Sequence, residues 1–540
     1  MPPHLLGKEL RMKPKAVCAV LCAFLGIIVT AKSAPPRAQD AKHHHYKIID
    51  IGTFGGPSAF GVPSSRILNN RGMLVGGSST ANSDPFAPNM CYLDCNVDRG
   101  FLWGGGTVTE LPTLPSASGL SNLPAGINSS GQIIGQIQNG AIDPATGWPE
   151  SRGVLWQGGH VLAIPTLGGS QATANSINDL GQVVGATLTS TPDPFANSPV
   201  ASCMVLPAFG FCGGSTFAAT SVFFPGTTET HAYLWRHGLT YDLGTLGGPD
   251  SNAWVINDRG EIAGWSFTSF TANASTGVPT VDPFFWDPEE GKMADIGSLG
   301  GTFGSIVWLN NRGQVAGASN LAGDSTEHPF LWSKHKGMQD LGTLGGTFGH
   351  ADWINDEGDV VGFATIANDA TGHAFLWHDG VMADLGTLGT DPASEAGSIN
   401  SKGQIVGGTF ILGVADLRGF LWENGGPMVD LNALVLPGSD LYVQTAGPIN
   451  DRGEIGCGGR LPNGNEHPCI LIPCDEDHPN IEGCDYGPVD PVVAAQVHPE
   501  PFAPATTPAK IQPLTPIERV ARLRSMLPER HGAFRVLSPK

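Results

Sequence analysis

The sequence predicts an all-β repeat protein, most simply an eight-bladed β-propeller made of four-stranded units of about 45 residues. Three observations carry this prediction. A short turn motif occurs eight times, an aromatic block follows each copy, and in most units a glycine-rich block follows the aromatic one. The composition agrees, because 74 Gly and 43 Pro with only 14% charged residues suit short strands joined by tight turns.

The turn motif reads INDEGDVVG at 354–362 and INDLGQVVG at 177–185. Every copy keeps an asparagine and, three residues later, a glycine; three such pairs are Asn178 and Gly181, Asn257 and Gly260, and Asn355 and Gly358. The acidic residues of 354–362 are not kept throughout: in four of the other seven copies Asp356 corresponds to Asn or Ser, at Asn70, Ser129, Asn311 and Ser401. A calcium loop would need those carboxylates, so the motif predicts a tight turn between two apolar arms, which is a β-hairpin.

The other two strands of each unit come from the aromatic block and from the glycine-rich DLGTLGG block. The tryptophans that end several aromatic blocks are expected to pack between neighbouring units; they include Trp332, Trp377 and Trp422. A four-stranded unit cannot bury its own faces, so adjacent units must share their cores. A seven-bladed propeller and a β-solenoid are the alternatives.

The two ends of the repeat array predict a closed ring. The segment HYKIIDIGT (45–53) is a glycine-rich-type strand with no aromatic strand before it, and HPCILI (467–472) is an aromatic-type strand with no glycine-rich strand after it. We expect these two segments to pair, which would remove two open sheet edges.

The regions outside the repeats have different compositions. Basic residues followed by an apolar run at 16–31 predict a signal peptide over 1–34, with a membrane anchor as the alternative, and 35–45 is expected to be a short spacer. The repeats fill 46–474. The Pro-rich segment 475–540 is predicted to be a disordered tail with a short helix at 515–527. No membrane span is expected after cleavage.

The cysteines beyond the signal peptide predict disulfide bonds. Their even number and close spacing suit an exported chain, and the absence of a CxxC pair argues against zinc. The four close pairs are Cys91 and Cys95, Cys203 and Cys212, Cys457 and Cys469, and Cys474 and Cys484.

The block His373-Ala374-Phe375-Leu376-Trp377, together with DLGTLGG and the turn motif, resembles the HAF repeat. This family of extracellular bacterial repeat proteins is named for its His-Ala-Phe motif. The resemblance covers residues 46–474 and implies export and a repetitive role at the cell surface. It implies no particular activity.

Candidate contacts with a ligand lie where the repeats differ. Between the turn motif and the aromatic block, repeats 1–4 carry longer connections than repeats 5–7, and the same connection should always emerge at one face. These inserts share an Asp-Pro-Phe motif, which gives the candidates Asp84 and Phe86, Asp193 and Phe195, and Asp282 and Phe284. The alternative is that each motif is a turn that tucks its phenylalanine under the loop.

The functional expectation is a secreted binding protein. A net charge of −20 argues against nucleic acid, and the sequence contains no common enzyme motif, so no cofactor and no metal site are predicted. We expect an extracellular or cell-surface location, or a periplasmic one, and an unidentified saccharide or protein ligand at the insert-bearing face. The alternatives are a structural surface component and an enzyme, a hydrolase or lyase acting on extracellular polymer. Acidic pairs facing each other in the inserts would favour the enzyme.

Overall fold

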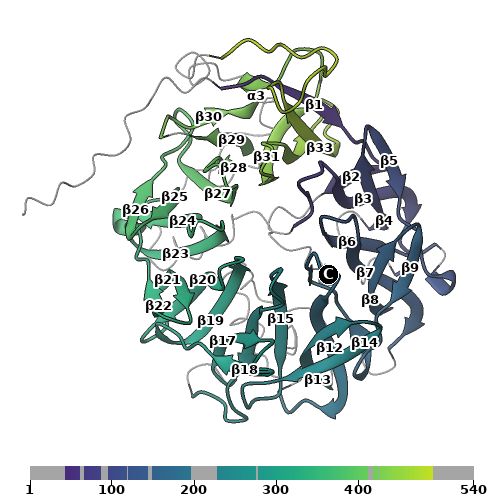
Figure 1. Cartoon of the computed structure of the whole chain (residues 1–540), viewed down its shortest axis with the longest axis vertical. Coiled ribbons are helices and arrows are strands. Elements are labelled where there is room, and N and C mark those ends of the chain that lie inside the picture. The colour runs from purple at the N-terminus through teal and green to yellow at the C-terminus, as the bar shows by residue number, and fades with distance from the viewer. Residues whose placement is uncertain are drawn as a thin grey trace, which may run out of the picture. The chain divides into compact units, whose positions relative to one another are not determined.

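The chain folds into a ring of eight antiparallel sheets, seen in a computed structural model (Figure 1). The structure describes residues 43–60, 66–86, 95–117, 119–143, 149–195, 228–274, 278–410, 417–423 and 425–489. All of them belong to the compact unit Ala41–Lys540. The predicted signal peptide and the predicted helix at 515–527 lie outside the described residues. No helix in the described part is long and apolar enough to cross a membrane.

Each sheet forms one blade, whose strands are named below in order from the centre of the ring outwards. Blade 1 contains β2 (Gly55–Phe60), β3 (Leu74–Ser83), β4 (Asn96–Gly104) and β5 (Thr107–Glu110). Blade 2 contains β6 (Asn122–Ile127), β7 (Ile133–Ile142), β8 (Pro149–Gln157) and β9 (His160–Ala163). Blade 3 contains β10 (Gly168–Ala172) and β11 (Ser176–Ile177) as a divided inner strand, then β12 (Val183–Pro192), β13 (Thr228–Arg236) and β14 (Leu239–Gly244). Blade 4 contains β15 (Ser251–Ile256), β16 (Ile262–Phe267), β17 (Val281–Asp287) and β18 (Lys292–Asp295).

The second half of the ring repeats this order. Blade 5 contains β19 (Gly300–Leu309), β20 (Gln314–Leu321), β21 (Glu327–Ser333) and β22 (Gly337–Asp340). Blade 6 contains β23 (Gly345–Ile354), β24 (Val360–Ile366), β25 (Gly372–His378) and β26 (Val381–Asp384). Blade 7 contains β27 (Ala393–Ile399), β28 (Ile405–Phe410), β29 (Leu417–Trp422) and β30 (Val429–Asp430). Blade 8 contains β31 (Tyr442–Ile449), β32 (Ile455–Arg460), β33 (Glu466–Pro473) and β1 (Tyr46–Asp50). The helical turns of the described residues are η1 (Pro115–Ala117), η3 (Ala367–Asp369) and α3 (Leu431–Leu434).

Blade 8 joins the two ends of the repeat array, as the sequence predicts. Strand β1 pairs antiparallel with β33, from Tyr46 opposite Pro473 to Asp50 opposite Cys469. The side chains reinforce this pairing, because His467 Nδ1 lies 2.9 Å from a carboxylate oxygen of Asp50. The first strand of the array therefore completes the last sheet.

The turn asparagines form a second closure at one end of the ring. The side-chain Nδ2 of each donates to the backbone carbonyl of the turn asparagine in the next blade, over 2.9–3.3 Å. The eight members of this asparagine ring, in order, are Asn69, Asn128, Asn178, Asn257, Asn310, Asn355, Asn400 and Asn450. The last donates back to the first, so the ring holds eight blades, and neither a solenoid nor seven blades fits it.

The predicted turn at 354–362 is also confirmed. Asn355 Oδ1 accepts from the backbone N–H groups of Gly358 and Asp359, and Gly358 has a φ of 97°, which favours glycine. Asp356 and Glu357 are exposed, and a carboxylate oxygen of Asp356 accepts from the backbone of Asn311 in blade 5. Asp356 therefore links its own turn to the turn of the neighbouring blade 5.

The predicted tryptophans pack between blades. Trp332 of blade 5 lies 5.0 Å, between ring centroids, from Phe285 of blade 4. Trp377 belongs to an apolar cluster that also contains Leu331 of blade 5, and Trp422 packs against a cluster shared by blades 6 and 7. The cores thus lie mainly between sheets, as expected for units that cannot bury their own faces.

The folded region is larger at both ends than the predicted repeat boundaries. Residues 475–489 do not begin a free tail, because Cys474 is bonded to Cys484 and the backbone of Val489 pairs with that of His43. His43 is not part of a loose spacer either: it is buried, with Nδ1 2.6 Å from Glu423 of blade 7. The two termini of the repeat array are therefore held together next to blade 8.

Two predicted disulfides are present, Cys457–Cys469 between β32 and β33 and Cys474–Cys484. Cys95 is also disulfide-bonded. Cys91, Cys203 and Cys212 lie outside the described residues. The first bond lies within blade 8, and the second joins the end of blade 8 to the segment that follows it.

Candidate functional site

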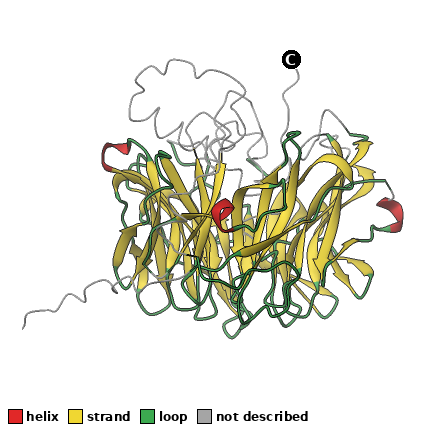
Figure 2. Cartoon of the chain, turned by 90° about the horizontal axis from the view of Figure 1, so that it is seen from above, coloured by secondary structure: helices red, strands yellow, loops and turns green. Residues whose placement is uncertain are grey.

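The long connections of repeats 1–4 all emerge at the end of the ring opposite the asparagine turns. This follows from the antiparallel order, since they join the second strand of a blade to its third. Figure 2 shows the strands running between two ends where the loops gather. We call the end with the long connections the insert end. Large parts of the inserts, including 87–94 and 196–227, lie outside the described residues.

The Asp-Pro-Phe motifs of the first and third inserts are turns. Asp84 and Asp193 are buried, and each accepts a 2.8 Å hydrogen bond from the backbone N–H two residues later, at Phe86 and Phe195. Both phenylalanines are half-buried. This is the alternative that the sequence left open, a local turn built by the aspartate side chain.

The third motif is part of a strand. Phe284 in β17 is fully buried in the core between blades 3 and 4, and Asp282 precedes it in the same strand. The predicted ligand residues therefore do not meet in one place: they belong to blades 1, 3 and 4, and Phe284 is a core residue.

In blades 1 and 2, the insert aspartate bonds to a serine at the start of the next blade. A carboxylate oxygen of Asp84 lies 3.3 Å from Ser121 Oγ, and one of Asp143 lies 2.5 Å from Ser170 Oγ. An acid thus meets a hydroxyl, which donates a hydrogen bond to it. These contacts fasten the insert of one blade to its neighbour.

Blade 3 departs from this arrangement, because its insert aspartate, Asp193, interacts electrostatically with two other acids, Glu229 and Asp250. Asp250 lies seven residues before the turn asparagine of blade 4, the position that Ser121 holds in blade 2. Asp193, Glu229 and Asp250, which we call the acid triad, are only 7%, 9% and 2% exposed. The backbone N–H of Thr230 donates to Asp250 over 2.7 Å.

The electrostatics of the acid triad raise the pKa of all three carboxyl groups. Burial, followed by the charge of Asp193 and then that of Glu229, raises the pKa of Asp250 well above its usual range. Burial also raises the pKa of Asp193, and burial together with Asp193 raises that of Glu229. His231 acts in the opposite sense on Glu229, since its Nε2 lies 3.7 Å from the carboxylate. Asp250 is therefore the group most strongly held in its neutral form, and Glu229 has a partner for its ionised form.

Aromatic side chains lie beside the acid triad. The ring of Phe195, two residues after Asp193, lies 6.4 Å from the ring of the buried Phe267 in blade 4. Phe195 thus presents a partly exposed apolar surface next to paired acids. The sequence motifs marked Asp193 and Phe195 but not Glu229 and Asp250. Asp250 stands out only when its position is compared with that of Ser121, the serine that bonds to the insert aspartate of blade 1.

The histidines of the His-Ala-Phe motif have a structural partner. His231, His328 and His373 each place Nδ1 2.9–3.0 Å from the aspartate that begins the glycine-rich block, Asp242, Asp340 and Asp384 respectively. These contacts link the third strand of a blade to the fourth. They lie in different blades and do not form a common site.

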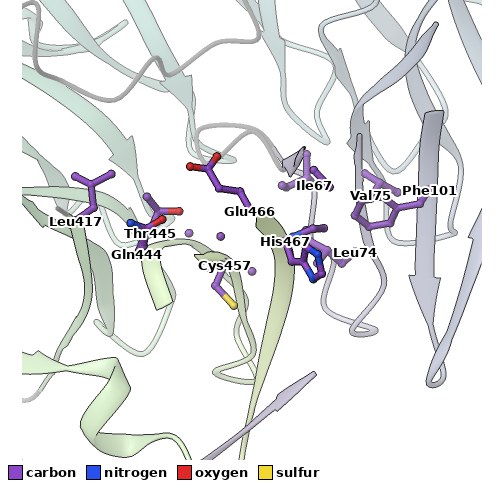
Figure 3. A pocket seen from close by; sticks show the side chains of 16 residues that line it. Ile67, Leu74, Val75, Phe101, Leu417, Gln444, Thr445, Cys457, Glu466 and His467 are labelled. Carbon is purple, nitrogen blue, oxygen red and sulfur yellow. The ribbon is translucent and has the colours of Figure 1, made fainter. Parts of the chain in front are cut away.

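A cavity of about 160 Å³ lies where blade 8 meets blade 1. Side chains of β31 and β32, including Gln444, Thr445 and Cys457, line one side, and Leu74, Val75 and Phe101 line the other (Figure 3). Ligand pockets for small molecules are usually about 300–1,000 Å³. This cavity is smaller and has a mainly apolar wall, so it has less to offer chemically than the acid triad.

One further group has the composition of a metal site. His350, Asp352 and Glu395 are buried on the inner strands β23 and β27 and can each offer one atom, all within 4.8 Å of one another. The sequence predicted no metal ligands, because these residues fall outside the recurring motifs. They could have been found by comparing blade 5 with blade 6, whose inner strands are nearly identical elsewhere.

No protein-family model matches the chain, and no curated protein matches it. Solved structures match its fold. The β-propeller domain of the Trilobed protease from Pyrococcus furiosus is 9% identical, with a TM-score of 0.37, over 69% of this chain and 98% of that one. A prolyl endopeptidase is 10% identical, with a TM-score of 0.43, over 81% of this chain and 56% of that one. Dipeptidyl peptidase 4 from Porphyromonas gingivalis is 10% identical, with a TM-score of 0.37, over 67% and 49%.

The comparison corrects the expectation of a binding protein that works through the insert-bearing face. The three propellers named above belong to peptidases, and this is the finding that stands against that expectation. The chain spans about half the length of the two intact peptidases. At these identities the likeness concerns the fold alone, so the case for an enzyme has to come from the chain's own residues.

Proposed function

We propose that this protein is a hydrolase acting on an extracellular or periplasmic polymer, with the acid triad as its reaction centre. The single observation that supports it is that a buried acid, Asp250, stands where blade 2 has the hydroxyl of Ser121, and that it interacts electrostatically with Asp193 and Glu229. Structural repeats conserve contacts that hold blades together. A buried set of like charges destabilises the fold, and such sets are typical of catalytic sites.

The chemistry follows from the protonation states. Asp250, held neutral, would donate its proton to the oxygen of the leaving group as the bond to the substrate breaks. The pKa of Glu229 is raised by burial and by Asp193, but His231 opposes this rise; in its ionised form Glu229 would accept a proton from the attacking water, whose oxygen forms the new bond. Paired carboxylates acting in this way are the usual means of breaking glycosidic bonds. With Phe195 as a surface for a sugar ring, the substrate class that fits is a polysaccharide.

The proposed location rests on the predicted signal peptide, the disulfides and the resemblance to the HAF repeat. Disulfide bonds persist in oxidising compartments. An exported hydrolase would meet polymeric substrates there. Membership of the HAF-repeat family stays a prediction.

The test uses variants that the repeat itself suggests. Asp250→Ser restores the acid–hydroxyl contact of blade 1, so it should fold at least as stably as the parent while losing activity by about 10²–10⁴-fold. Activity is measured as release of reducing ends from a panel of polysaccharides. Asp84→Asn is the matched control, since it alters the equivalent acid of blade 1 and should leave activity unchanged.

Two results would overturn the proposal. One is the absence of bond cleavage by the parent protein on every polysaccharide and peptide polymer tested. The other is cleavage that persists in both Asp250→Ser and Glu229→Gln, which would move the reaction centre elsewhere. Cleavage of peptides only, lost in the same variants, would keep the site and replace the substrate class.

A further inference from the structure

The inner strands of blades 5 and 6 are close copies that differ at two chemically significant positions. They read GGTFGSIVWLN (300–310) and GGTFGHADWIN (345–355). Ser305 is replaced by His350 and Val307 by Asp352; the other differences, Ile306 to Ala351 and Leu309 to Ile354, are between apolar residues. Both replacements introduce groups that bind metal ions.

The third member of the group comes from the neighbouring blade. Glu395 lies in β27, five residues before its turn asparagine, as His350 does in β23. His350 Nε2 lies 3.0 Å from Glu395 Oε1 and 3.6 Å from Asp352 Oδ1. All three side chains are at least nine-tenths buried, at 7%, 1% and 3% exposure for His350, Asp352 and Glu395.

The two distances from His350 suit ligands of one ion, and the oxygens of Asp352 and Glu395 lie within 4.8 Å of each other, so a small closing movement would bring all three onto it. Ligand atoms held at about 2.0–2.2 Å from a metal, with angles between right-angled and tetrahedral, lie about 3.0–3.6 Å apart. Imidazole nitrogen and carboxylate oxygen together are the ligand types used by zinc and related first-row metals, whereas calcium prefers oxygen alone. Two carboxylates would balance the charge of a divalent ion.

The surrounding residues fix the orientation of the ligands. The register of β23 against β24 shifts between Ala351 and Trp353, which is the irregularity that places Asp352. The ring of His350 stacks on Phe363 at 5.5 Å between centroids, and Phe348 meets it edge-on at 5.6 Å. Such a wall of aromatic rings restricts the imidazole before any ion binds.

We propose that His350, Asp352 and Glu395 form a binding site for a divalent first-row transition metal, with zinc or manganese as the ions of choice, which links the inner strands of blades 6 and 7. The site lies on other blades than the acid triad and does not depend on the proposed hydrolase activity. With three protein ligands, it leaves at least one coordination position for water or a substrate oxygen.

The experiment uses the full chain, stripped of metal by chelation and dialysis. Binding of Zn²⁺, Mn²⁺ and Ca²⁺ is measured by titration calorimetry, and the bound ion is counted by elemental analysis. We expect one tight zinc or manganese ion per chain and a higher melting temperature, since a ligand that binds only the folded state stabilises it. Calcium should bind at least 100-fold more weakly.

Two variants make the result specific to the site. His350→Ser with Asp352→Val gives blade 6 the residues of blade 5, so its metal-free melting temperature should be at least that of the parent while zinc affinity falls at least 100-fold. Glu395→Gln keeps the shape of the third ligand and should also weaken binding. The control variant His44→Ala, His45→Ala removes two histidines of the N-terminal run 43–45, which could bind metal ions weakly. It should leave binding at the tight site unchanged.

The proposal is overturned if the stripped parent protein takes up neither zinc nor manganese, or if it prefers calcium. It is equally overturned if the His350→Ser, Asp352→Val variant binds as tightly as the parent. Loss of binding in the His44→Ala, His45→Ala variant alone would assign the metal to the N-terminal run.

Discussion

The asparagine of each turn uses both ends of its amide group, and each end has a different partner. In blade 5, Asn310 Oδ1 accepts from the backbone N–H groups of Arg312 and Gln314, which shapes its own turn. Its Nδ2 donates to the carbonyl of Asn355 over 2.9 Å and so binds blade 6. Aspartate could supply the first contact, but its carboxylate has no donor for the second.

Asn310→Asp is therefore expected to destabilise the protein although it keeps the turn. The carboxylate would be buried, and it would face the carbonyl oxygen of Asn355 and the side-chain oxygen of Gln314. We expect a loss of about 2–4 kcal/mol in the free energy of unfolding, measured by denaturant titration. Arg312→Leu, which introduces the residue found at this exposed position in blade 3, should change it by less than about 0.5 kcal/mol. Equal effects of the two changes would contradict the role given to the amide.

Residues outside the repeat motifs were the hardest to assign from the sequence. The repeated asparagine and glycine predicted the turn, because both are needed in every copy, but not the partner of the amide in the next blade. His43 was expected in a spacer because its partner Glu423 is 380 residues away in sequence. Asp193 could be singled out, whereas its significance depends on Asp250, which no motif marks.

Within a blade, the third and fourth strands are held by a polar pair at the insert end. In blades 3, 5, 6 and 8 the pair is a histidine with an aspartate, and in blade 1 Arg99 lies 3.3 Å from Glu110 at the same positions. Blade 4 differs, because Asp282 takes the place of the histidine opposite Asp295. Burial and the charge of Asp295 raise the pKa of Asp282 to about 6.

This pair makes the stability of blade 4 depend on pH in a defined direction. The folded-state pKa of Asp282 lies above its ordinary value of 3.8, so the folded protein holds a proton that the unfolded chain releases. The stabilisation is complete below about pH 4 and is lost as the pH rises through about 6. Since the side chain is only half-buried, we expect an effect on the order of 1 kcal/mol.

Asp282→Asn should accordingly raise the melting temperature by about 1 °C at pH 7.5 and have little effect at pH 4. Asp282→His should do the same at pH 7.5 by restoring the pair that blades 3, 5, 6 and 8 contain. The measurement is a series of thermal melts of the three proteins between pH 4 and 8. A shift of the same size at every pH would rule out titration of Asp282 as the cause.

Elements were predicted from the sequence more successfully than sites. Each hairpin, aromatic strand and glycine-rich strand recurs often enough for the repeat to be recognised even though individual residues differ between copies. Sites depend on one or two departures from that period. The sequence shows that blade 6 has His350 and Asp352 where blade 5 has Ser305 and Val307. It does not show that Glu395 lies beside them, because that depends on how blades 6 and 7 pack together.

For the molecule as a whole, closure of the ring decides how it unfolds. An open array of repeats loses its terminal units first, because each end has a neighbour on one side only. In this ring β1 completes blade 8, and the asparagine ring returns from Asn450 to Asn69. No blade is terminal, so unfolding of the described ring should be a single cooperative event.

Ile48→Asp tests this expectation. Ile48 is buried in the core of blade 8, whereas its neighbour Lys47 is half-buried and points to the other face of β1. We expect Ile48→Asp to lower the free energy of unfolding by about 3 kcal/mol or more and to broaden or split the calorimetric transition. Lys47→Asp is the control and should leave one sharp transition. A single sharp transition in Ile48→Asp, at a lower temperature, would show that closure at β1 does not govern cooperativity.

The asparagine ring also bears on how such a protein can change over generations. Every turn brings its own donor and its own acceptor, so any unit can follow any other at that end, and a duplicated or exchanged unit would still find its amide partner. At the insert end the interactions differ from blade to blade: Asp84 bonds to Ser121, whereas Asp193 acts on Asp250 through its charge. The contacts between blades are thus the same all round the ring at the asparagine end, and they are specific to each pair of neighbouring blades at the insert end. Substitutions at the insert end can therefore introduce new chemistry without any change to the asparagine ring that holds the blades together.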